Sequence, residues 1–465
     1  MRAIPLTALM ATMLLASFLL AAGCASVPDI DDALDPPVME RPEIVGAHGP
    51  LSAGQRQAVL ARLRQQGRDT DLLDQHLAIE QTVARSPLVI GNRTTILRDG
   101  DNTFRAMFRA MHEAKDHINL EYYIVEDIES EGERLGDLLI AKRREGVAVN
   151  LIYDSYGSLA TPRDFFDRLR DAGISVVEFN PINPLRARNG YTLNDRDHRK
   201  ILVVDGRTAI IGGVNLYTGY QNRRLSKLTG SDAGSSDYWH DTDLEIRGPA
   251  VAEIQRLFFD HWAQQKGPTL DHNNFFPTDF PPGTETLRIL GSDHEDLLPR
   301  YYATLISALR DAEKNVFLTA AYFVPTHQEL EALEEAARRG VDVHLLLPSK
   351  SDSDSALNVG RSHYSDLLEA GVKINEIQGE MLHSKTVTID GVWSIIGSSN
   401  FDHRSVLFND EIDAVILGRD TATQLETLFR NDMKDTAPIE LSAWQDRPFG
   451  EKFDEMRARI WQSLL

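Results

Sequence analysis

Two stretches of the chain carry the same residue types that could do chemistry. The sequence HRKILVVDGRTAIIGGVN begins at His198 and HSKTVTIDGVWSIIGSSN begins at His383, with the same spacing of histidine, lysine, aspartate, glycine and asparagine. In each copy the lysine follows the histidine by two residues, and alternate residues of a β-strand point to the same face. His198 with Lys200, and His383 with Lys385, are therefore predicted to project together. A chain that carries such a pair twice is expected to bring both pairs into one site.

Two imidazoles and two ammonium groups suit the transfer of a phosphoryl group. The positive charges can hold the equatorial oxygens on which negative charge develops. One neutral histidine can attack phosphorus, and the other, protonated, can donate to the leaving oxygen. Protonated lysines do not ligate a metal, and the sequence has no CxxC or HExxH pattern. Neither a metal nor a cofactor is predicted.

Each stretch is predicted to fold as a β-hairpin. Apolar, β-branched runs flank Asp205-Gly206 in the first copy and Asp390-Gly391 in the second, and Asp-Gly is a strong signal for a two-residue turn. The flanking strands are expected at 201–204, 208–211, 386–389 and 393–396. Aspartate is favoured at such turns for local reasons alone, so both aspartates are predicted to be mainly structural.

The residues after each hairpin supply further hydrogen-bond donors. Asn215 and Asn400 follow a glycine-containing turn. Both are predicted to donate to phosphoryl oxygens, helped by the hydroxyl group of Ser398.

The doubled pattern, HxK, four residues, Asp, six residues, Gly-x-x-Asn, resembles the signature of the phospholipase D superfamily. The resemblance makes one set of residues catalytic: His198, Lys200, Asp205, His383, Lys385 and Asp390. Within the superfamily the chain most resembles bacterial cardiolipin synthases, from about Pro87 to Gly418. The stretches that carry this likeness are PLVIGN from Pro87, HINLEYYI from His117, YFVP from Tyr322, RGVDVHLLLP from Arg339 and NFDHRS from Asn400.

The resemblance implies a membrane-associated phosphatidyltransferase. Its expected reaction makes cardiolipin from phosphatidylglycerol, or from another phospholipid such as phosphatidylethanolamine, through a phosphatidyl-histidine intermediate. The alternative is a phospholipase D-type phosphodiesterase, in which water replaces the acceptor lipid. The motif is common to both, so the sequence leaves transfer and hydrolysis open.

An acidic residue follows each hairpin at a matching distance from a closing glycine. This alignment pairs Asp241 with Glu411. A carboxylate that accepts a hydrogen bond from one imidazole nitrogen fixes the tautomer and leaves the other nitrogen free. By resemblance, we expect Asp241 to orient His198, which attacks phosphorus, and Glu411 to orient His383, which acts as acid and base. The reverse division of labour stays open because the motifs are nearly symmetric, and Asp243 and Asp413 align equally well.

Strands and helices alternate in the same order in two parts of the chain. The alternation predicts α/β sandwich halves at about 87–270 and 285–445, related by a pseudo-two-fold axis. Matching anchors are Gly146-Val147 with Gly340-Val341, and Ala172-Gly173 with Ala370-Gly371. The active site is expected in the cleft between the halves.

The N-terminus resembles a bacterial lipoprotein signal. Leu6 to Ala22 is mostly apolar, and the sole cysteine, Cys24, follows a run of small residues, which predicts a leader over 1–23 and lipidation at Cys24. Ala25 after the cysteine favours the outer membrane of a Gram-negative cell, facing the periplasm. The alternative is an uncleaved anchor helix, since Ile4 to Gly23 is about long enough to span a bilayer. Residues 24–86 are predicted to be a tether to about residue 50, followed by helix.

Charge and the remaining segments complete the expectations. A formal net charge of -21 opposes binding to nucleic acid, which relies on basic surface. Gln221 to Tyr238 is an insertion into the first half, and it is expected either to cover the pocket mouth or bind headgroups, or to form a surface loop. Residues 446–465 are predicted to form an amphipathic helix with an apolar face at Phe453, Met456, Ile460, Trp461 and Leu464. Packing on the second half is the expectation for this face, with a membrane interface as the alternative.

Overall fold

The computed structural model describes residues 27–30, 42–183, 192, 194–221, 238–270, 274–293, 296, 299–460 and 462. The predicted leader, Cys24 and most of the predicted insertion, residues 222–237, lie outside the described residues.

The strands of the two parts follow the same spatial order. The first half runs β8 (Ser175–Phe179), β7 (Ala148–Asp154), β4 (His117–Tyr122), β10 (Lys200–Val204), β11 (Thr208–Gly212), β13 (Thr242–Arg247) and β3 (Leu88–Arg98). The second half runs β18 (Lys373–Ile377), β17 (Asp342–Pro348), β15 (Asn315–Thr319), β20 (Thr386–Ile389), β21 (Trp393–Gly397), β23 (Asn409–Leu417) and β14 (Glu285–Ser292). The predicted duplication is therefore confirmed. The halves join where β3 and β14 pair antiparallel, with Val89 opposite Leu287.

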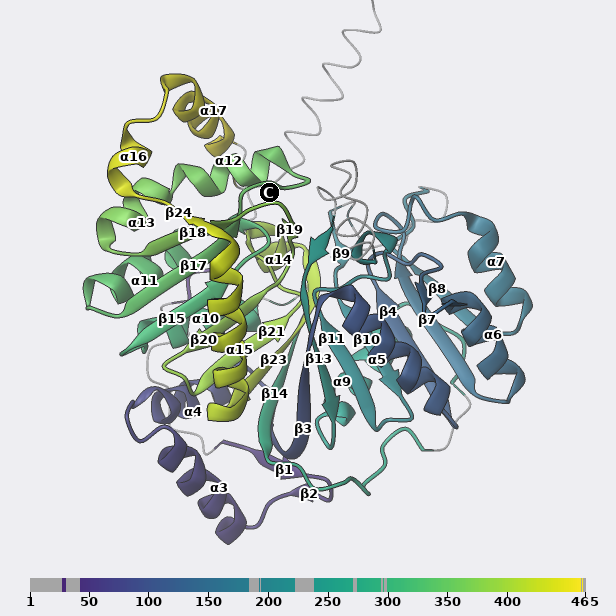
Figure 1. The fold of residues 1–465 in the computed structure, drawn as a ribbon. Helices are drawn as coiled ribbons and strands as arrows, with labels where there is room; N and C mark the ends of the chain where they lie inside the picture. The colour runs from purple at the N-terminus through teal and green to yellow at the C-terminus, as the bar shows by residue number, and fades with distance from the viewer. Residues whose placement is uncertain are drawn as a thin grey trace, which may run out of the picture.

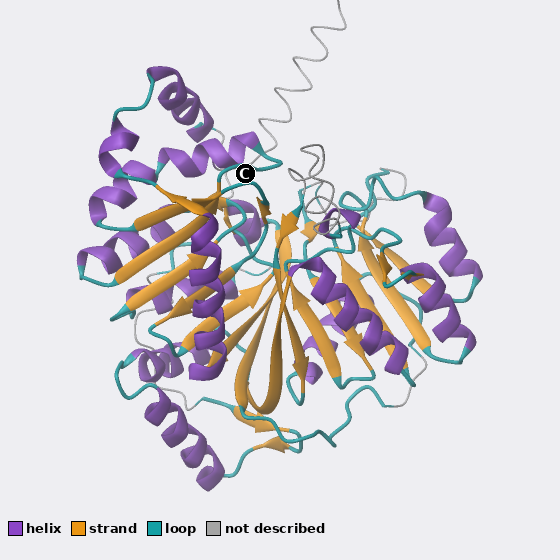
Figure 2. Cartoon of the chain, viewed as in Figure 1, coloured by secondary structure: helices purple, strands orange, loops and turns teal. Residues whose placement is uncertain are grey.

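Helices cover both faces of this sheet, as expected for an α/β sandwich (Figure 2). In the first half, α5 (Asp99–Glu113), α6 (Leu135–Arg144) and α7 (Arg163–Asp171) cover one face and α9 (Val251–Gln264) covers the other. Alternation along the strand separates the two cores: Leu151 packs with the α5–α7 cluster, and Ile152 packs with Phe258 and Trp262 of α9.

The second half repeats this arrangement. Its helices are α10 (Arg300–Arg310), α11 (His327–Arg338) and α13 (Tyr364–Ala370) on one face and α15 (Arg419–Asp432) on the other. Leu345 packs on the first of these faces and Leu346 packs with Phe429 of α15. Figure 1 shows α5 and α15, which are not equivalent helices, on the same side of the sheet, as a pseudo-two-fold axis between the halves requires.

A shared core lies between the two halves. Isoleucines of the first half, including Ile201, Ile211 and Ile246, belong to the same buried cluster as Ile396 and Ile412 of the second. Because this cluster is continuous, the strands that carry the two motifs are held in a fixed relation to each other.

The predicted tether is wrong for the residues that the structure describes there. Ile30 is fully buried in the core of the second half, and β1 (Ile44–Gly46) pairs in parallel with β3 and antiparallel with β2 (Gly49–Pro50). These apolar residues are isolated in the sequence, and their partners are distant, so no periodicity shows them. The predicted helices follow as α3 (Ala53–Gln66) and α4 (Leu72–Val83).

The C-terminus contains the predicted helix, α17 (Phe449–Arg459), after the short α16 (Leu441–Gln445). The expectation that its apolar face packs on the second half is wrong, because Phe453, Met456 and Ile460 are exposed. Trp461 and Leu464 lie outside the described residues. Within the described part of the chain, none of the helices has the length and apolar character needed to cross a bilayer.

Candidate active site

Both motifs form the predicted hairpins, and their aspartates hold the turns. Asp205 and Gly206 have φ angles of 53° and 62°, and Asp390 and Gly391 have 54° and 67°, as a type I′ turn requires. The Asp205 carboxylate accepts the backbone N–H groups of Lys115, Asp116 and His117 at 2.9 Å. The Asp390 carboxylate likewise accepts from residues 313–315 at 2.8 to 3.1 Å. These contacts agree with a structural role for both aspartates.

The segment before each motif histidine crosses to the other half. The short strand β9 (Arg196–Asp197) pairs in parallel with the start of β23, and the His198 N–H donates to the Asp410 carbonyl at 2.9 Å. Equivalently, β19 (Met381–Leu382) pairs in parallel with β12 (Trp239–His240), and the His383 N–H donates to the His240 carbonyl at 2.7 Å. Each histidine therefore lies beside the acidic segment of the opposite half.

This exchange corrects the predicted pairing of histidines with carboxylates. His198 Nδ1 lies 2.9 Å from both carboxylate oxygens of Glu411, not beside Asp241. His383 Nδ1 lies 2.7 Å from Asp241 Oδ2, not beside Glu411. The in-half pairing fails because β9 and β19 each have only a few residues and find their partners across the interface.

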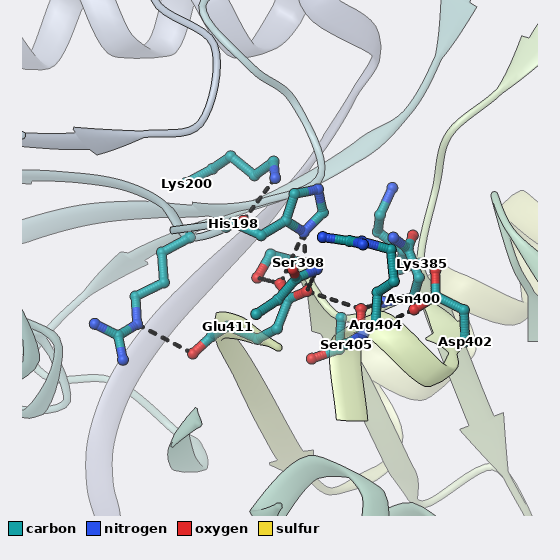
Figure 3. A network of polar contacts seen from close by, with 12 residues as sticks. His198, Lys200, Lys385, Ser398, Asn400, Asp402, Arg404, Ser405 and Glu411 are labelled. Carbon is teal, nitrogen blue, oxygen red and sulfur yellow. Dashed lines mark hydrogen bonds and ion pairs between the residues drawn. The ribbon is translucent and has the colours of Figure 1, made fainter. Parts of the chain in front are cut away.

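Glu411 is held by donors from its own half (Figure 3). It accepts from the Ser398 hydroxyl at 2.6 Å, the Ser405 hydroxyl at 2.8 Å and Asn409 Nδ2 at 3.2 Å. Burial alone would raise the pKa of Glu411, but His198, Lys200 and Ser398 together lower it. The prediction that Ser398 donates to phosphoryl oxygens is wrong, because its hydroxyl donates to Glu411 and accepts from the Ile412 N–H at 2.9 Å.

Asp241 is held in a different way. Its Oδ2 accepts from the Tyr220 hydroxyl at 3.1 Å, and the same hydroxyl lies 3.0 Å from His383 Nδ1. The ring of Trp239 lies 4.9 Å from that of His383, measured between centroids. Asp241 and His383 are both buried, so this pair is closed in by aromatic rings rather than by small hydroxyl residues.

The lysines lie beside their histidines, as the strand spacing predicts. Lys200 Nζ donates to the His198 carbonyl at 2.6 Å, and Lys385 Nζ donates to the His383 carbonyl and lies 3.0 Å from His383 Nδ1. Burial lowers the pKa of Lys200 to about 7 and also lowers the pKa of Lys385. An anionic group placed between these ammonium groups would favour their charged forms.

The site favours the neutral form of both imidazoles. Burial lowers the pKa of His198 to about 4 in spite of Glu411, and burial with the charge of Lys385 lowers the pKa of His383 to about 4. Each pKa is also lowered by the lysine of the opposite motif, Lys385 for His198 and Lys200 for His383. The two motifs therefore meet in one electrostatic environment, as their duplication suggests.

A pocket of about 260 Å³ opens beside His198. Asn400 lines it, and Asn400 Oδ1 has no hydrogen-bond partner among the described residues. The pocket wall comes from both halves: Tyr123, Arg196, His198, Tyr322, Val324, Asp352, Ser353, Ala356, Asn400, Asp402, Arg404 and Asn409. Asn215 is placed differently, because its Oδ1 accepts the Ile124 N–H at 3.1 Å.

The other two aligned acids, Asp243 and Asp413, bind groups other than the imidazoles. Asp243 accepts the Val214 N–H at 3.0 Å, and Asp413 accepts the Ser399 hydroxyl at 2.6 Å. Burial raises the pKa of both carboxyl groups, that of Asp413 to about 8. The structure thus selects Asp241 and Glu411 as the partners of the imidazoles.

One buried group of side chains has the composition of a metal site. Ligand atoms of Glu121, Asp197 and His261 lie within 4.8 Å of one another. His261 Nδ1 is 2.8 Å from Glu121 Oε1, and Arg199 Nη1 donates to that same oxygen at 3.4 Å. The Arg199 guanidinium therefore already supplies these carboxylates with the positive charge that a bound metal ion would bring.

The sequence reasoning missed Ser405 and Tyr220. Each follows a motif asparagine by five residues, Ser405 after Asn400 and Tyr220 after Asn215. Each places a hydroxyl group on the carboxylate of its own half. The equal spacing is visible in the sequence, but serine and tyrosine are different residue types, so the two positions do not align as a motif.

Comparison with known proteins gives one consistent result. A family described as "Cardiolipin synthase, PLD-like domain" matches residues 107–225 and 305–433. A cardiolipin synthase of Alkalihalophilus pseudofirmus is 32% identical over 415 residues, covering 89% of this chain and 79% of that protein. One from a Geobacillus species is 34% identical over 394 residues, covering 84% and 76%. The crystal structure of phosphatidylserine synthase from Haemophilus influenzae has a similar fold, with a TM-score of 0.62 and 12% identity over 83% of this chain and 99% of that one.

Proposed function

Because the chain belongs to the phospholipase D-like family of cardiolipin synthases, we propose that it transfers a phosphatidyl group from one phosphatidylglycerol to another, forming cardiolipin and releasing glycerol. Phosphatidylethanolamine is the alternative phospholipid substrate. The single observation that carries this proposal is the crosswise assembly of two histidine–carboxylate pairs and two lysines. Every group that two successive phosphoryl displacements require is present there.

In the first displacement His198 attacks phosphorus through Nε2. Glu411 holds Nδ1, so the lone pair of the neutral imidazole lies on Nε2. The P–O bond to glycerol breaks, and His383 gives its proton to the departing oxygen. Lys200, Lys385 and the Asn400 amide hold the phosphoryl oxygens. The phosphodiester charge raises the pKa of His383 from its low value, so that it binds the proton that it donates.

In the second displacement a hydroxyl group of the acceptor phosphatidylglycerol attacks the phosphatidyl-histidine. His383, held by Asp241, takes the hydroxyl proton, and the P–N bond to His198 breaks. Each displacement inverts phosphorus, so the two together retain its configuration. Net inversion at a chiral phosphorus would contradict the covalent path.

The test is product analysis with the purified chain. Mixed micelles of phosphatidylglycerol should yield cardiolipin and glycerol in equal amounts, measured by mass spectrometry, and His198→Ala should yield neither. Phosphatidic acid in place of cardiolipin would identify the hydrolase instead.

The reaction is proposed to need no metal, because the lysines supply the positive charge. Turnover should survive exhaustive treatment with EDTA. Loss of turnover that one added metal restores would contradict this assignment and would direct attention to Glu121, Asp197 and His261.

We further propose that the protein is lipid-anchored through Cys24 to a membrane and faces the periplasm, with the outer membrane favoured. The support is the sequence pattern at the N-terminus. Cys24→Ala should accumulate as an unprocessed precursor without incorporated fatty acid. Equal fatty-acid labelling of the two proteins would exclude lipidation at this cysteine.

A further inference from the structure

The amphipathic helix α17 presents its apolar side to solvent. Phe449, Phe453, Met456 and Ile460 recur at helical spacing and have exposed fractions of 80%, 45%, 59% and 73%. We call these four residues the apolar stripe. An unpaired apolar stripe of this length is unusual on a helix of a globular protein, because such a face ordinarily covers the core.

Polar contacts on the opposite side fix this orientation. Glu455 is buried and forms two hydrogen bonds with Arg447, at 2.5 and 3.0 Å. Arg459 donates to His363 Nδ1 at 2.8 Å, and Gln462 Nε2 donates to the Pro325 carbonyl at 2.7 Å. Because the charged side of the helix is bound to the protein, the apolar stripe cannot roll inward without breaking these bonds.

The apolar stripe lies near the rim of the catalytic pocket. α17 packs on α12 (Asp354–Ser362), and Ala458 packs against the cluster of Val324, Ala356 and Val359. Val324 and Ala356 also line the pocket that contains His198. Figure 1 shows α17 at the end of the molecule where β9 and β19 lead into the motif histidines.

The other rim carries exposed apolar side chains as well. Tyr156 and Leu159, in the loop after β7, have exposed fractions of 58% and 63%. The guanidinium of Arg196, a pocket residue, lies 6.0 Å from the centre of the Tyr156 ring. Among the described residues, one further large apolar side chain is exposed, Phe276, and it lies elsewhere, against Arg256 and Phe259.

The N-terminal end of the described chain reaches the same place. Asp29 accepts from Gln328 Nε2 at 2.8 Å, and Gln328 follows shortly after Pro325, whose carbonyl accepts from Gln462. The first described residues therefore lie on the side of the molecule that carries the apolar stripe.

We propose that the apolar stripe, Tyr156 and Leu159 form one docking surface for a phospholipid bilayer, with the catalytic pocket between its two parts. This inference deepens the proposed function and rests on it, because a phospholipid substrate has its headgroup at the bilayer surface. The charged residues of α17 balance, with three acidic and three basic side chains in its sequence. Insertion of apolar side chains, rather than attraction to anionic lipid, therefore drives the docking.

The test compares the full chain with two variants. The double variant Phe449→Asp with Ile460→Asp places charge in the apolar stripe, and Phe276→Asp is the matched control on an exposed phenylalanine elsewhere. Turnover is measured on phosphatidylglycerol vesicles and on a soluble nitrophenyl phosphodiester. Hydrogen exchange of α17 and of residues 154–161 is followed with and without vesicles.

We expect the double variant to lose about tenfold or more of its turnover on vesicles and none on the soluble diester, since each buried apolar side chain contributes on this scale. Phe276→Asp should keep both activities. Vesicles should slow exchange in α17 and in residues 154–161 of the unaltered chain and not of the double variant.

Unchanged vesicle turnover and exchange in the double variant would overturn the docking surface. Slowed exchange that depends on protein concentration without vesicles would also overturn it, in favour of a second copy of the chain. Vesicle-dependent protection without any transfer activity would instead retain the docking surface and reject the proposed function.

Discussion

The His198–Glu411 pair and the His383–Asp241 pair come from nearly identical motifs, yet they are supported differently. Glu411 accepts from two serine hydroxyls and an asparagine amide as well as from His198. Asp241 shares one tyrosine hydroxyl with His383. The first carboxylate is fixed by three side-chain donors besides His198, and the second by one rigid aromatic side chain and by the backbone N–H of Thr242, 2.7 Å from its Oδ1.

The difference follows from the length of the acidic side chain. Ser398 and Gly213 occupy equivalent positions after the two hairpins. A Cβ atom at Gly213 would lie 2.2 Å from Asp241 Oδ1, so the carboxylate already fills the space that a serine would need. Glutamate at 411 leaves room for Ser398 to donate to it. The difference between Gly213 and Ser398 therefore compensates for the difference between Asp241 and Glu411.

Each half of the active site is incomplete without the other. A motif histidine comes from one half and its carboxylate from the opposite half, because β9 and β19 cross the interface. The hydrogen bonds to the two carboxylates, and so the roles of the two histidines, can then differ although the motifs are nearly identical.

The largest expected effect separates the two histidines. His198→Ala should lower turnover by about 10⁴-fold or more, since it removes the nucleophile. His383→Ala should lower turnover by about 10²- to 10⁴-fold, since it removes the acid and base. With a nitrophenyl phosphodiester, whose leaving group needs little protonation, His383→Ala should still form a covalent adduct, detectable by mass spectrometry, and His198→Ala should form none. Adduct in His198→Ala alone would exchange the two roles.

The next effect tests the crosswise carboxylates. Glu411→Gln should slow formation of the covalent adduct by up to about 10⁴-fold, because the amide cannot hold the productive tautomer of His198. Asp241→Asn should leave adduct formation from the nitrophenyl diester nearly intact and slow its transfer to the acceptor. Stopped-flow release of nitrophenol measures the first step. The opposite pattern would support the in-half pairing that the sequence suggested.

The third effect concerns His240, the residue that precedes the Asp241 carboxylate. His240 precedes Asp241 and binds Asp99 at 2.5 Å and Asp432 at 3.1 Å, so it joins the two halves. Burial alone would lower the pKa of His240, but the hydrogen bonds to Asp432 and Asp99 raise it to about 10. The unfolded value is about 6.5. The stabilisation is therefore fully present below pH 6.5 and is lost as the pH rises through 10.

His240→Gln should lower the free energy of unfolding by about 1 to 3 kcal/mol at pH 6, since it removes one of the two cations beside these buried carboxylates and leaves Arg98, which lies 2.6 Å from Asp432 and 3.8 Å from Asp99. It should also remove the loss of stability that the unaltered protein shows between pH 6.5 and 10, measured by urea unfolding. In the folded fraction of His240→Gln, transfer of the phosphatidyl group to the acceptor should be slower than formation of the covalent adduct.

The control is His261→Gln. Asp410 precedes Glu411 as His240 precedes Asp241, and the His261 imidazole lies 3.6 Å from the Asp410 carboxylate. The loss of this imidazole should slow adduct formation instead of the acceptor step.

The local parts of this site were predictable from the sequence, and the long-range parts were not. The hairpins, the histidine–lysine pairs and the duplication follow from the Asp-Gly turns and from residue spacing, which act over a few residues. The partners of Glu411 and Asp241 depend on strands of two residues that pair across the interface. The outward apolar stripe depends on Glu455 and Arg447, whose partly buried pairing has no signature in hydrophobic periodicity.

The smallest expected effect concerns the two hairpin turns, which differ by one hydrogen bond. Asp205 and Asp390 hold equivalent backbone segments, but Asp390 Oδ2 also accepts from Thr70 Oγ1 at 2.8 Å. The Thr70 hydroxyl in turn accepts the Leu72 N–H at 3.2 Å, at the start of α4. This contact ties the N-terminal helices to the second half.

Thr70→Val should lower the free energy of unfolding by about 0.5 to 1.5 kcal/mol and leave turnover unchanged, because the turn lies at the far end of β20 from His383. Asp390→Asn and Asp205→Asn should each cost about 1 to 3 kcal/mol, since each weakens hydrogen bonds to buried backbone N–H groups. Urea unfolding measures all three. In the Asp390→Asn background, Thr70→Val should cost less than it does alone, because the charged acceptor is already gone. An Asp390→Asn protein that is folded but inactive would mean that this carboxylate acts in the reaction rather than in the turn.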